Sequence, residues 1–137
     1  MYRNDPLTGL ASAFVFRARA HERMRVGDVQ VATVKLRGFT DYNARHGHFA
    51  GDLLLRRAAE SLVDRLDALT TLCARDGGKF LVMVLPGEPE PDLSALGDIE
   101  VDVRWHRIGS PEELDALLPR GLSGTLPPGR EGRDFIM

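Results

Sequence analysis

The sequence lacks several features that would assign it to a specialised class of protein. Its 137 residues include a single cysteine, Cys73, so no disulfide framework can form within the chain. No apolar run reaches membrane-spanning length, and no basic stretch followed by an apolar segment marks a signal peptide. No basic block interleaved with aromatic residues points to a nucleic acid partner. The sequence therefore predicts a cytoplasmic protein that inserts into no membrane and binds no nucleic acid.

The composition is that of one globular domain. Hydrophobic residues make up 43% of the chain and charged residues 28%, and this length can bury a substantial core. Residues 1–87 hold 13 Lys and Arg against 9 Asp and Glu, whereas residues 88–137 hold 5 against 11. The basic half could attract an anionic ligand, but ordinary surface charge on amphipathic helices is the simpler interpretation. We expect a single domain over 1–137, with its core in 5–118.

Hydrophobic periodicity divides the chain into helices and strands. The clearest helix covers 50–66, where leucine and alanine recur at helical spacing. Residues 29–36 are β-branched or small on both faces, which is typical of a central strand. The other predicted elements are helices at 13–25 (with Ser12 as N-cap), 38–46 and 110–118, strands at 71–75, 79–85 and 99–108, and at most a stub of helix at 93–96.

This order of elements predicts an α/β sandwich with a central, mostly antiparallel sheet and flanking helices. Residues 119–137 are rich in Gly and Pro and form a predicted irregular tail, with a candidate edge strand at 134–136.

Four motifs give the chain a recognisable pattern, and their order and spacing agree with one family. They are Asp-Pro-Leu-Thr-Gly-Leu at 5–10, Phe-Thr-Asp-Tyr-Asn at 39–43, Gly-His-Phe-Ala-Gly-Asp-Leu-Leu-Leu at 47–55 and Arg-Asp-Gly-Gly-Lys-Phe at 75–80. Together they resemble the GGDEF domain of diguanylate cyclases, a relative of the palm fold of nucleotidyl cyclases. The resemblance is strong over 5–86 and weak beyond, where the C-terminal part looks truncated.

The hairpin motif departs from the family at the residues that name it. Two glycines followed by two acids and Phe are expected, but here the degenerate sequence is Gly77, Gly78, Lys79 and Phe80. Adjacent glycines suit a two-residue turn that needs positive φ. We expect Asp76 and Lys79 to face each other across the strand ends, in a tight loop that holds no metal ion.

The resemblance also implies where the chemistry of the family would take place. Such domains condense two GTP molecules into cyclic di-GMP with divalent cations, which require carboxylate oxygens. Lys35, Arg37 and Lys79 stand at the metal-facing positions, and Thr40 replaces the phosphate-contacting lysine. Cations in place of anions would repel Mg²⁺. We therefore predict that the domain is not an enzyme and has no catalytic residue, metal or cofactor, although the three basic residues could neutralise phosphates themselves.

Part of the guanine pocket of the family is retained in the sequence. Asn43 and Asp52 match the residues that read the guanine edge, for which amide and carboxylate groups are suited. A simpler interpretation, which we favour, is that Asn43 hydrogen-bonds near a helix end and that Asp52 caps the helix at 50–66. The inhibitory product site of the family would fall on Ala68 and Thr71, which cannot form it.

Two functions remain open from the sequence. The reduced helical cover would leave apolar sheet surface exposed, which favours a protein partner. We expect a catalytically inactive GGDEF-like domain that acts as a protein-interaction module in bacterial signalling. The alternative is a non-catalytic receptor for GTP, GMP or cyclic di-GMP through Asn43 and Asp52.

Overall fold

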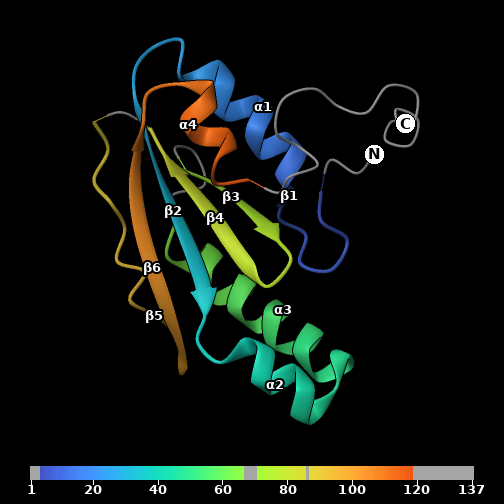
Figure 1. Ribbon diagram of the computed structural model, residues 1–137. Helices are drawn as coiled ribbons and strands as arrows, with labels where there is room; N and C mark the ends of the chain where they lie inside the picture. Colours follow the sequence, from blue (N-terminus) through green and yellow to red (C-terminus); the bar gives the residue numbers. More distant parts are fainter. Residues whose placement is uncertain (1–3, 67–70, 86, 119–137) are drawn as a thin grey trace, which may run out of the picture.

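The computed structural model describes residues 4–66, 71–85 and 87–118, which form a six-stranded sheet between two layers of helices (Figure 1). The strands are β1 Ala11–Ser12, β2 Val29–Leu36, β3 Thr71–Asp76, β4 Lys79–Val84, β5 Ala95–Leu96 and β6 Ile99–Ile108. The helices are α1 Ala13–Arg23, α2 Phe39–His46, α3 His48–Asp64 and α4 Pro111–Asp115. None of these helices is long and apolar enough to cross a bilayer.

The sheet is mostly antiparallel, as predicted. Its strand order is β1-β3-β4-β2-β6-β5, and the pairing of β1 with β3 is parallel. The central strand β2 pairs antiparallel with β4 on one side and with β6 on the other. Because side chains alternate along β2, it contributes to both faces of the sheet and divides the interior into two layers.

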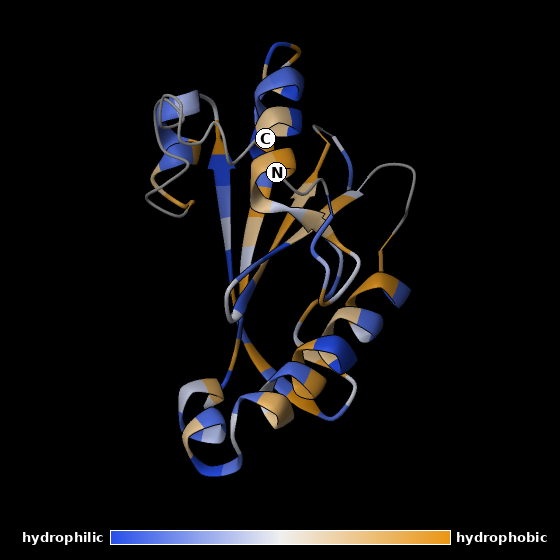
Figure 2. Ribbon diagram, turned by 90° about the vertical axis from the view of Figure 1, so that its right-hand side faces the viewer, coloured by the Kyte–Doolittle hydropathy of each residue, from blue (hydrophilic) through white to orange (hydrophobic). Residues whose placement is uncertain are grey.

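One apolar layer lies between the sheet and α3. Helix α3 presents a buried stripe to even-numbered residues of β2 and β4; the stripe is Leu55, Ala58, Ala59 and Leu62, and the strand residues are Ala32, Val34, Leu36, Phe80, Val82 and Val84. Figure 2 shows apolar residues along the central strands and both apolar and polar residues along the helices. This distribution is expected for helices with one face in solvent.

The other apolar layer lies between the sheet and α1 with α4. Phe16 and Ala20 of α1 and Leu114 of α4 are buried against odd-numbered strand residues, which are Val29, Val31, Leu81 and Met83. Arg17 and Asp115 join the two helices, with 2.9 Å between Nε and Oδ1. Among the described residues, the α1–α4 layer covers one end of this face; the opposite end of β2, β4 and β6 carries polar residues.

The helix boundaries agree with the sequence to within a few residues. The hydroxyl of Ser12 accepts a hydrogen bond from the backbone N–H of Val15 at 3.1 Å, so it is the N-cap of α1 as predicted. Helix α3 begins at His48, two residues before the predicted start. Helix α4 covers Pro111–Asp115 and is shorter than the predicted 110–118.

Two predictions about the C-terminal part are wrong for the described residues. Residues 93–96 form no helix: Asp92 accepts a hydrogen bond from the Ser94 N–H at 3.1 Å, and Ala95–Leu96 pairs with β6. Four residues cannot repay the cost of helix nucleation. The sheet is not left bare either, because Leu93 and Leu96 are buried against the α3 layer. The tail 119–137, including the candidate strand at 134–136, lies outside the described residues, as does Ala68.

Cys73 gives a test of the α3 layer. The residue is half-buried in β3, and burial raises the pKa of its thiol to about 12. A thiol reacts as the thiolate, so we expect Cys73 to react far more slowly with a disulfide reagent at neutral pH than a free thiol does. The measurement is the labelling rate with and without denaturant. A native rate equal to the denatured rate would contradict this packing.

Candidate functional site

The N-terminal turn and the glycine hairpin are joined by a buried ion pair. Asp5 is 8% exposed, and its two carboxylate oxygens accept hydrogen bonds from Nε and Nη2 of Arg75 at 2.7 and 2.8 Å. The backbone N–H and the hydroxyl of Thr8 donate to Asp5 Oδ2 at 2.9 and 2.6 Å. Arg75 Nη1 donates to the carbonyl of Gly77 at 2.7 Å. The pair therefore fixes the N-terminal turn against the hairpin.

Charge and hydrogen bonding keep Asp5 ionised. Burial by itself would raise the pKa of Asp5, but the hydrogen bonds from Arg75 and Thr8 outweigh it and lower the pKa from 3.8 to about 2. The same contact with Asp5 raises the pKa of Arg75, with a smaller contribution from the charge of Asp52. The sequence analysis missed this pair. The sequence feature that could have indicated it is that Asp5 and Arg75 belong to two motifs, each of which lies next to a predicted turn.

The hairpin between β3 and β4 turns over two residues, as predicted. Asp76 and Lys79 are paired across the strand ends, with Nζ 3.7 Å from Oδ2. The two glycines have different roles, however. Gly77 has φ of +60°, which favours glycine. Gly78 does not have positive φ; a Cβ on it would lie 2.8 Å from Cδ2 of Phe39, so it is needed for close packing of α2.

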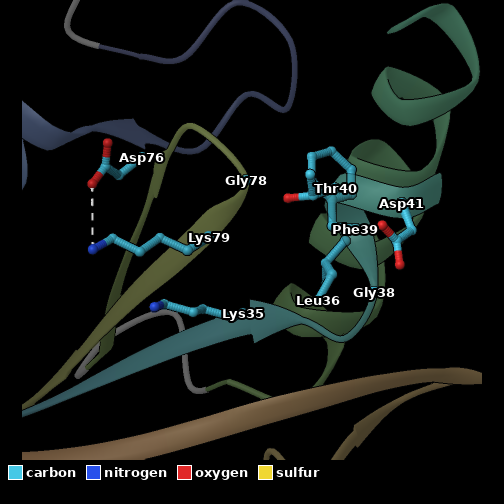
Figure 3. A pocket seen from close by; sticks show the side chains of 9 residues that line it. All are labelled: Lys35, Leu36, Gly38, Phe39, Thr40, Asp41, Asp76, Gly78 and Lys79. Carbon is cyan, nitrogen blue, oxygen red and sulfur yellow. Dashed lines mark ion pairs between the residues drawn. The ribbon is translucent and has the colours of Figure 1, made fainter. Parts of the chain in front are cut away.

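The structure brings together two of the three basic residues at the positions implied for metal binding. Lys35 at the end of β2 lies directly opposite Lys79 of β4 in the antiparallel register. Figure 3 shows both side chains pointing the same way, away from Thr40 and Asp41. Arg37 is turned toward β6 instead, where it contacts Asp102 at 2.7 Å and Glu100 at 3.2 Å. The hydrogen bond to Asp102 raises the pKa of Arg37 and lowers that of Asp102.

A hollow of about 400 Å³ lies beside these lysines (Figure 3). It is lined by residues from the end of β2, the start of α2 and the hairpin, including Thr40, Asp41 and Asp76. Divalent cations need several oxygen ligands in one place. Asp76 is paired with Lys79, and the part of the chain that the structure describes holds no cluster of three His, Cys, Asp or Glu residues suited to a metal. These residues do not fit a divalent cation.

The two residues predicted to read guanine lie in different environments. Asn43 lines a second hollow of about 470 Å³ with Phe39, Thr40 and His48. Its side chain lies against Gly51, and its Oδ1 is buried with no hydrogen-bond partner among the described residues. Asp52 is exposed on α3 and does not line this hollow.

The simpler interpretation of both residues is wrong in detail. Asp52 does not cap α3, because that helix begins four residues earlier at His48, with Gly47 as its N-cap. Gly47 has φ of +90° and also ends α2, as predicted for a glycine after a helix. Within the described residues, the Oδ1 of Asn43 makes no hydrogen bond near a helix end. Neither residue therefore has the structural role expected of it. The Oδ1 of Asn43 is a buried acceptor whose hydrogen bond the described residues do not supply.

The comparisons with known proteins agree with this architecture. The sequence profile described as "Diguanylate cyclase, GGDEF domain" matches residues 3–103. The chain belongs to the GGDEF domain family. Two curated relatives are an uncharacterized signaling protein of Caulobacter vibrioides, 30% identical over 97 residues, and an uncharacterized protein, y4lL, of Sinorhizobium fredii, 31% identical over 121 residues. The matches cover 67% and 83% of this GGDEF domain but only 12% and 14% of those proteins.

Solved structures show the same fold. Diguanylate cyclase SiaD of Pseudomonas aeruginosa, in complex with its activator SiaC, superposes with a TM-score of 0.65 at 22% identity, over 78% of this chain and 51% of that one. A sensory box/GGDEF family protein of Caulobacter crescentus gives 0.64 at 24%, over 84% and 92%. The GGDEF domain of DgcB from Caulobacter crescentus, in complex with c-di-GMP, gives 0.61 at 18%, over 77% of each chain. At these identities the likeness establishes the fold.

The buried ion pair predicts a pH dependence of stability. The pKa of Asp5 is about 2 in the folded state against 3.8 as its ordinary value, so its contribution is complete above pH 4 and is lost as the pH falls toward 2. The shift corresponds to about 2 kcal/mol. Denaturant unfolding across this range should show a steeper loss of unfolding free energy for the parent chain than for Asp5→Asn. Equal slopes would contradict the role of the pair.

Proposed function

We propose that this GGDEF domain is catalytically inactive and works by contacting another protein in a bacterial signalling system, in the reducing cytoplasm that an unpaired cysteine suits. The observation that carries the proposal is the pairing of Lys35 with Lys79. The family resemblance assigns metal-binding carboxylates to these positions. Two ammonium groups there repel Mg²⁺. Without a divalent ion, nothing stabilises the charge that develops on the phosphates of two GTP molecules as they are joined.

The carboxylates that remain nearby do not replace the missing ones. Asp76 is engaged with Lys79, and Asp102 with Arg37. Asp41 lies on the far side of the hollow from the two lysine side chains (Figure 3). Each of these acids would have to leave its place to ligate a cation, and a site built from one carboxylate binds Mg²⁺ weakly.

An exposed apolar pair supports the protein-contact role. Phe49 is 78% exposed and Leu53 is 43% exposed, and they lie one turn apart on α3. Large apolar side chains that face water in adjacent positions are typical of contact surfaces. The similar protein SiaD was solved in complex with an activator protein, so a GGDEF domain in such an assembly has a structural precedent.

A second candidate function is that of a guanine nucleotide receptor. The unpartnered, buried Oδ1 of Asn43 beside the hollow of about 470 Å³ is the observation that favours it. An amide can exchange hydrogen bonds with the edge of guanine. The exposed position of Asp52 weakens this candidate, because the carboxylate would have to turn toward the base.

The inactive state predicts that purified protein forms no cyclic di-GMP from GTP with Mg²⁺ or Mn²⁺. The measurement is chromatography of the nucleotides after prolonged incubation, with an active diguanylate cyclase as the positive control. Product formation by the parent chain, lost in Lys35→Met, would overturn the proposal.

The contact role predicts that one defined partner is recovered with the parent chain and with Val26→Asp, but not with Phe49→Asp. Val26 is 89% exposed in the turn after α1 and is therefore a matched control for the added charge. Equal recovery with both variants would assign the contact to another surface.

The receptor function predicts micromolar binding of GTP, measured by calorimetry, that Asn43→Ala abolishes.

A further inference from the structure

The solvent side of α3 carries most of the large apolar side chains that are exposed. Four such side chains are exposed among the described residues, and three of them lie on this helix: Phe49, Leu53 and Val63. Helix α3 packs on the sheet through its opposite side, in the layer across from α1 and α4 (Figure 1). A helix with one buried stripe normally has polar residues on its solvent side. Apolar residues gathered there instead indicate a contact surface.

Leu53 and Val63 belong to a row of four exposed residues with two charged residues between them. The row consists of Leu53, Arg56, Glu60 and Val63. Its steps are of three, four and three residues, and this spacing keeps side chains on one line along a helix. We refer to these four residues as the outer row.

The two charges of the outer row are not neutralised within the part of the chain that the structure describes. Arg56 and Glu60 lie four residues apart, but neither forms an ion pair or a side-chain hydrogen bond with any described residue. The neighbouring Arg57 differs, because it contacts Asp98 between β5 and β6 at 2.9 Å. The outer row thus presents one free cation and one free anion, flanked on each side by an apolar residue.

A second copy of the outer row is complementary to the first when the two helices run antiparallel. With a two-fold axis midway between Arg56 and Glu60, Arg56 lies opposite Glu60 of the second copy. Leu53 then lies opposite Val63 of the second copy. The axis repeats both contacts, which gives two central ion pairs between two apolar layers. Alternating steps of three and four residues are those with which paired helices interlock their side chains.

Other alignments of the two helices are less favourable. A parallel pair would place Arg56 against Arg56 and Glu60 against Glu60, and like charges in such positions are destabilising. An antiparallel pair shifted by seven residues would place Leu53 against Arg56, so that an apolar side chain would face a charge. The outer row therefore selects one orientation and one register.

We propose that the outer row is a self-association surface, through which two copies of this domain pair antiparallel along α3. Leu53 and Val63 lie about 15 Å apart along the helix. A contact of this length buries less than the roughly 1,000 Å² in total that a stable interface needs, so the dimer is weak and forms at high local concentration. The surface shares Leu53 with the proposed contact role but does not rest on that role. Phe49 lies one turn before Leu53, outside the outer row.

The test is sedimentation equilibrium of the purified full chain from micromolar to near-millimolar concentration. We expect a monomer–dimer equilibrium with a dissociation constant in the high micromolar range. Arg56→Glu and Glu60→Arg should each weaken it roughly tenfold, because each replaces two ion pairs by two contacts of like charge. Arg19→Glu is the matched control, since Arg19 is exposed on α1 across the sheet and the change in charge is the same as in Arg56→Glu. Far-ultraviolet circular dichroism and unfolding curves check that each variant is folded.

A double variant tests the register itself. Arg56→Glu combined with Glu60→Arg reverses both charges and restores the two ion pairs across the axis, so self-association should return to that of the parent chain. An equimolar mixture of the two single variants should also associate, because one copy presents two acids and the other presents two arginines.

The proposal is overturned by any of three results. These are a chain that stays monomeric at near-millimolar concentration, association that the Arg56 and Glu60 variants weaken no more than Arg19→Glu does, or a folded double variant that associates no better than the single variants. The last result would assign the outer row to a different protein. None of these measurements bears on cyclic di-GMP formation or on recovery of a partner through Phe49, so failure here is distinguishable from failure of the proposed function.

Discussion

The ion pair between Asp5 and Arg75 is the constraint on which the site end of the molecule depends. Asp5 closes the N-terminal turn, while Arg75 belongs to β3 and donates to the first glycine of the hairpin. The parallel pairing of β1 with β3 brings the two segments together. Because Asp5 is buried, loss of Arg75 would leave its carboxylate without a cation, which would destabilise the fold. The hairpin thus retains a rigid support, although Lys79 stands where the family resemblance implies an acid.

The central strand β2 contributes to both apolar layers and to the polar end of the sheet. Val31 and Ala32 are buried on its two faces, Val31 in the α1–α4 layer and Ala32 in the α3 layer. Toward its end the α3 face stays apolar, whereas the opposite face changes to Thr33 and Lys35. The sheet is therefore a packed core at one end and a charged surface at the other. Among the described residues, no helix covers the second end, so the side chain of Lys35 is open to solvent.

The backbone at this end of the molecule is that of the family, although its charges differ from those that the family resemblance implies. The fold matches solved GGDEF domains, and the hairpin still turns on two glycines. The family resemblance assigns acids to the positions of Lys35 and Lys79, and we propose that this change in charge disfavours a metal ion at the edge. Arg37 does not share in this change, because it is held by acids of β6.

The sequence by itself determined the element order, the central strand at 29–36, the two-residue hairpin and the family, because these follow from local periodicity, turn residues and motif spacing. Tertiary structure decided the rest. Only strand register pairs Lys35 with Lys79 and places Arg104 beside Thr33, since these residues are far apart in the chain. Likewise, only packing separates Arg37 from the lysines, joins Asp5 to Arg75 and leaves the Oδ1 of Asn43 without a hydrogen-bond partner among the described residues. Local patterns specify which strands form; contacts between distant residues depend on how those strands are aligned.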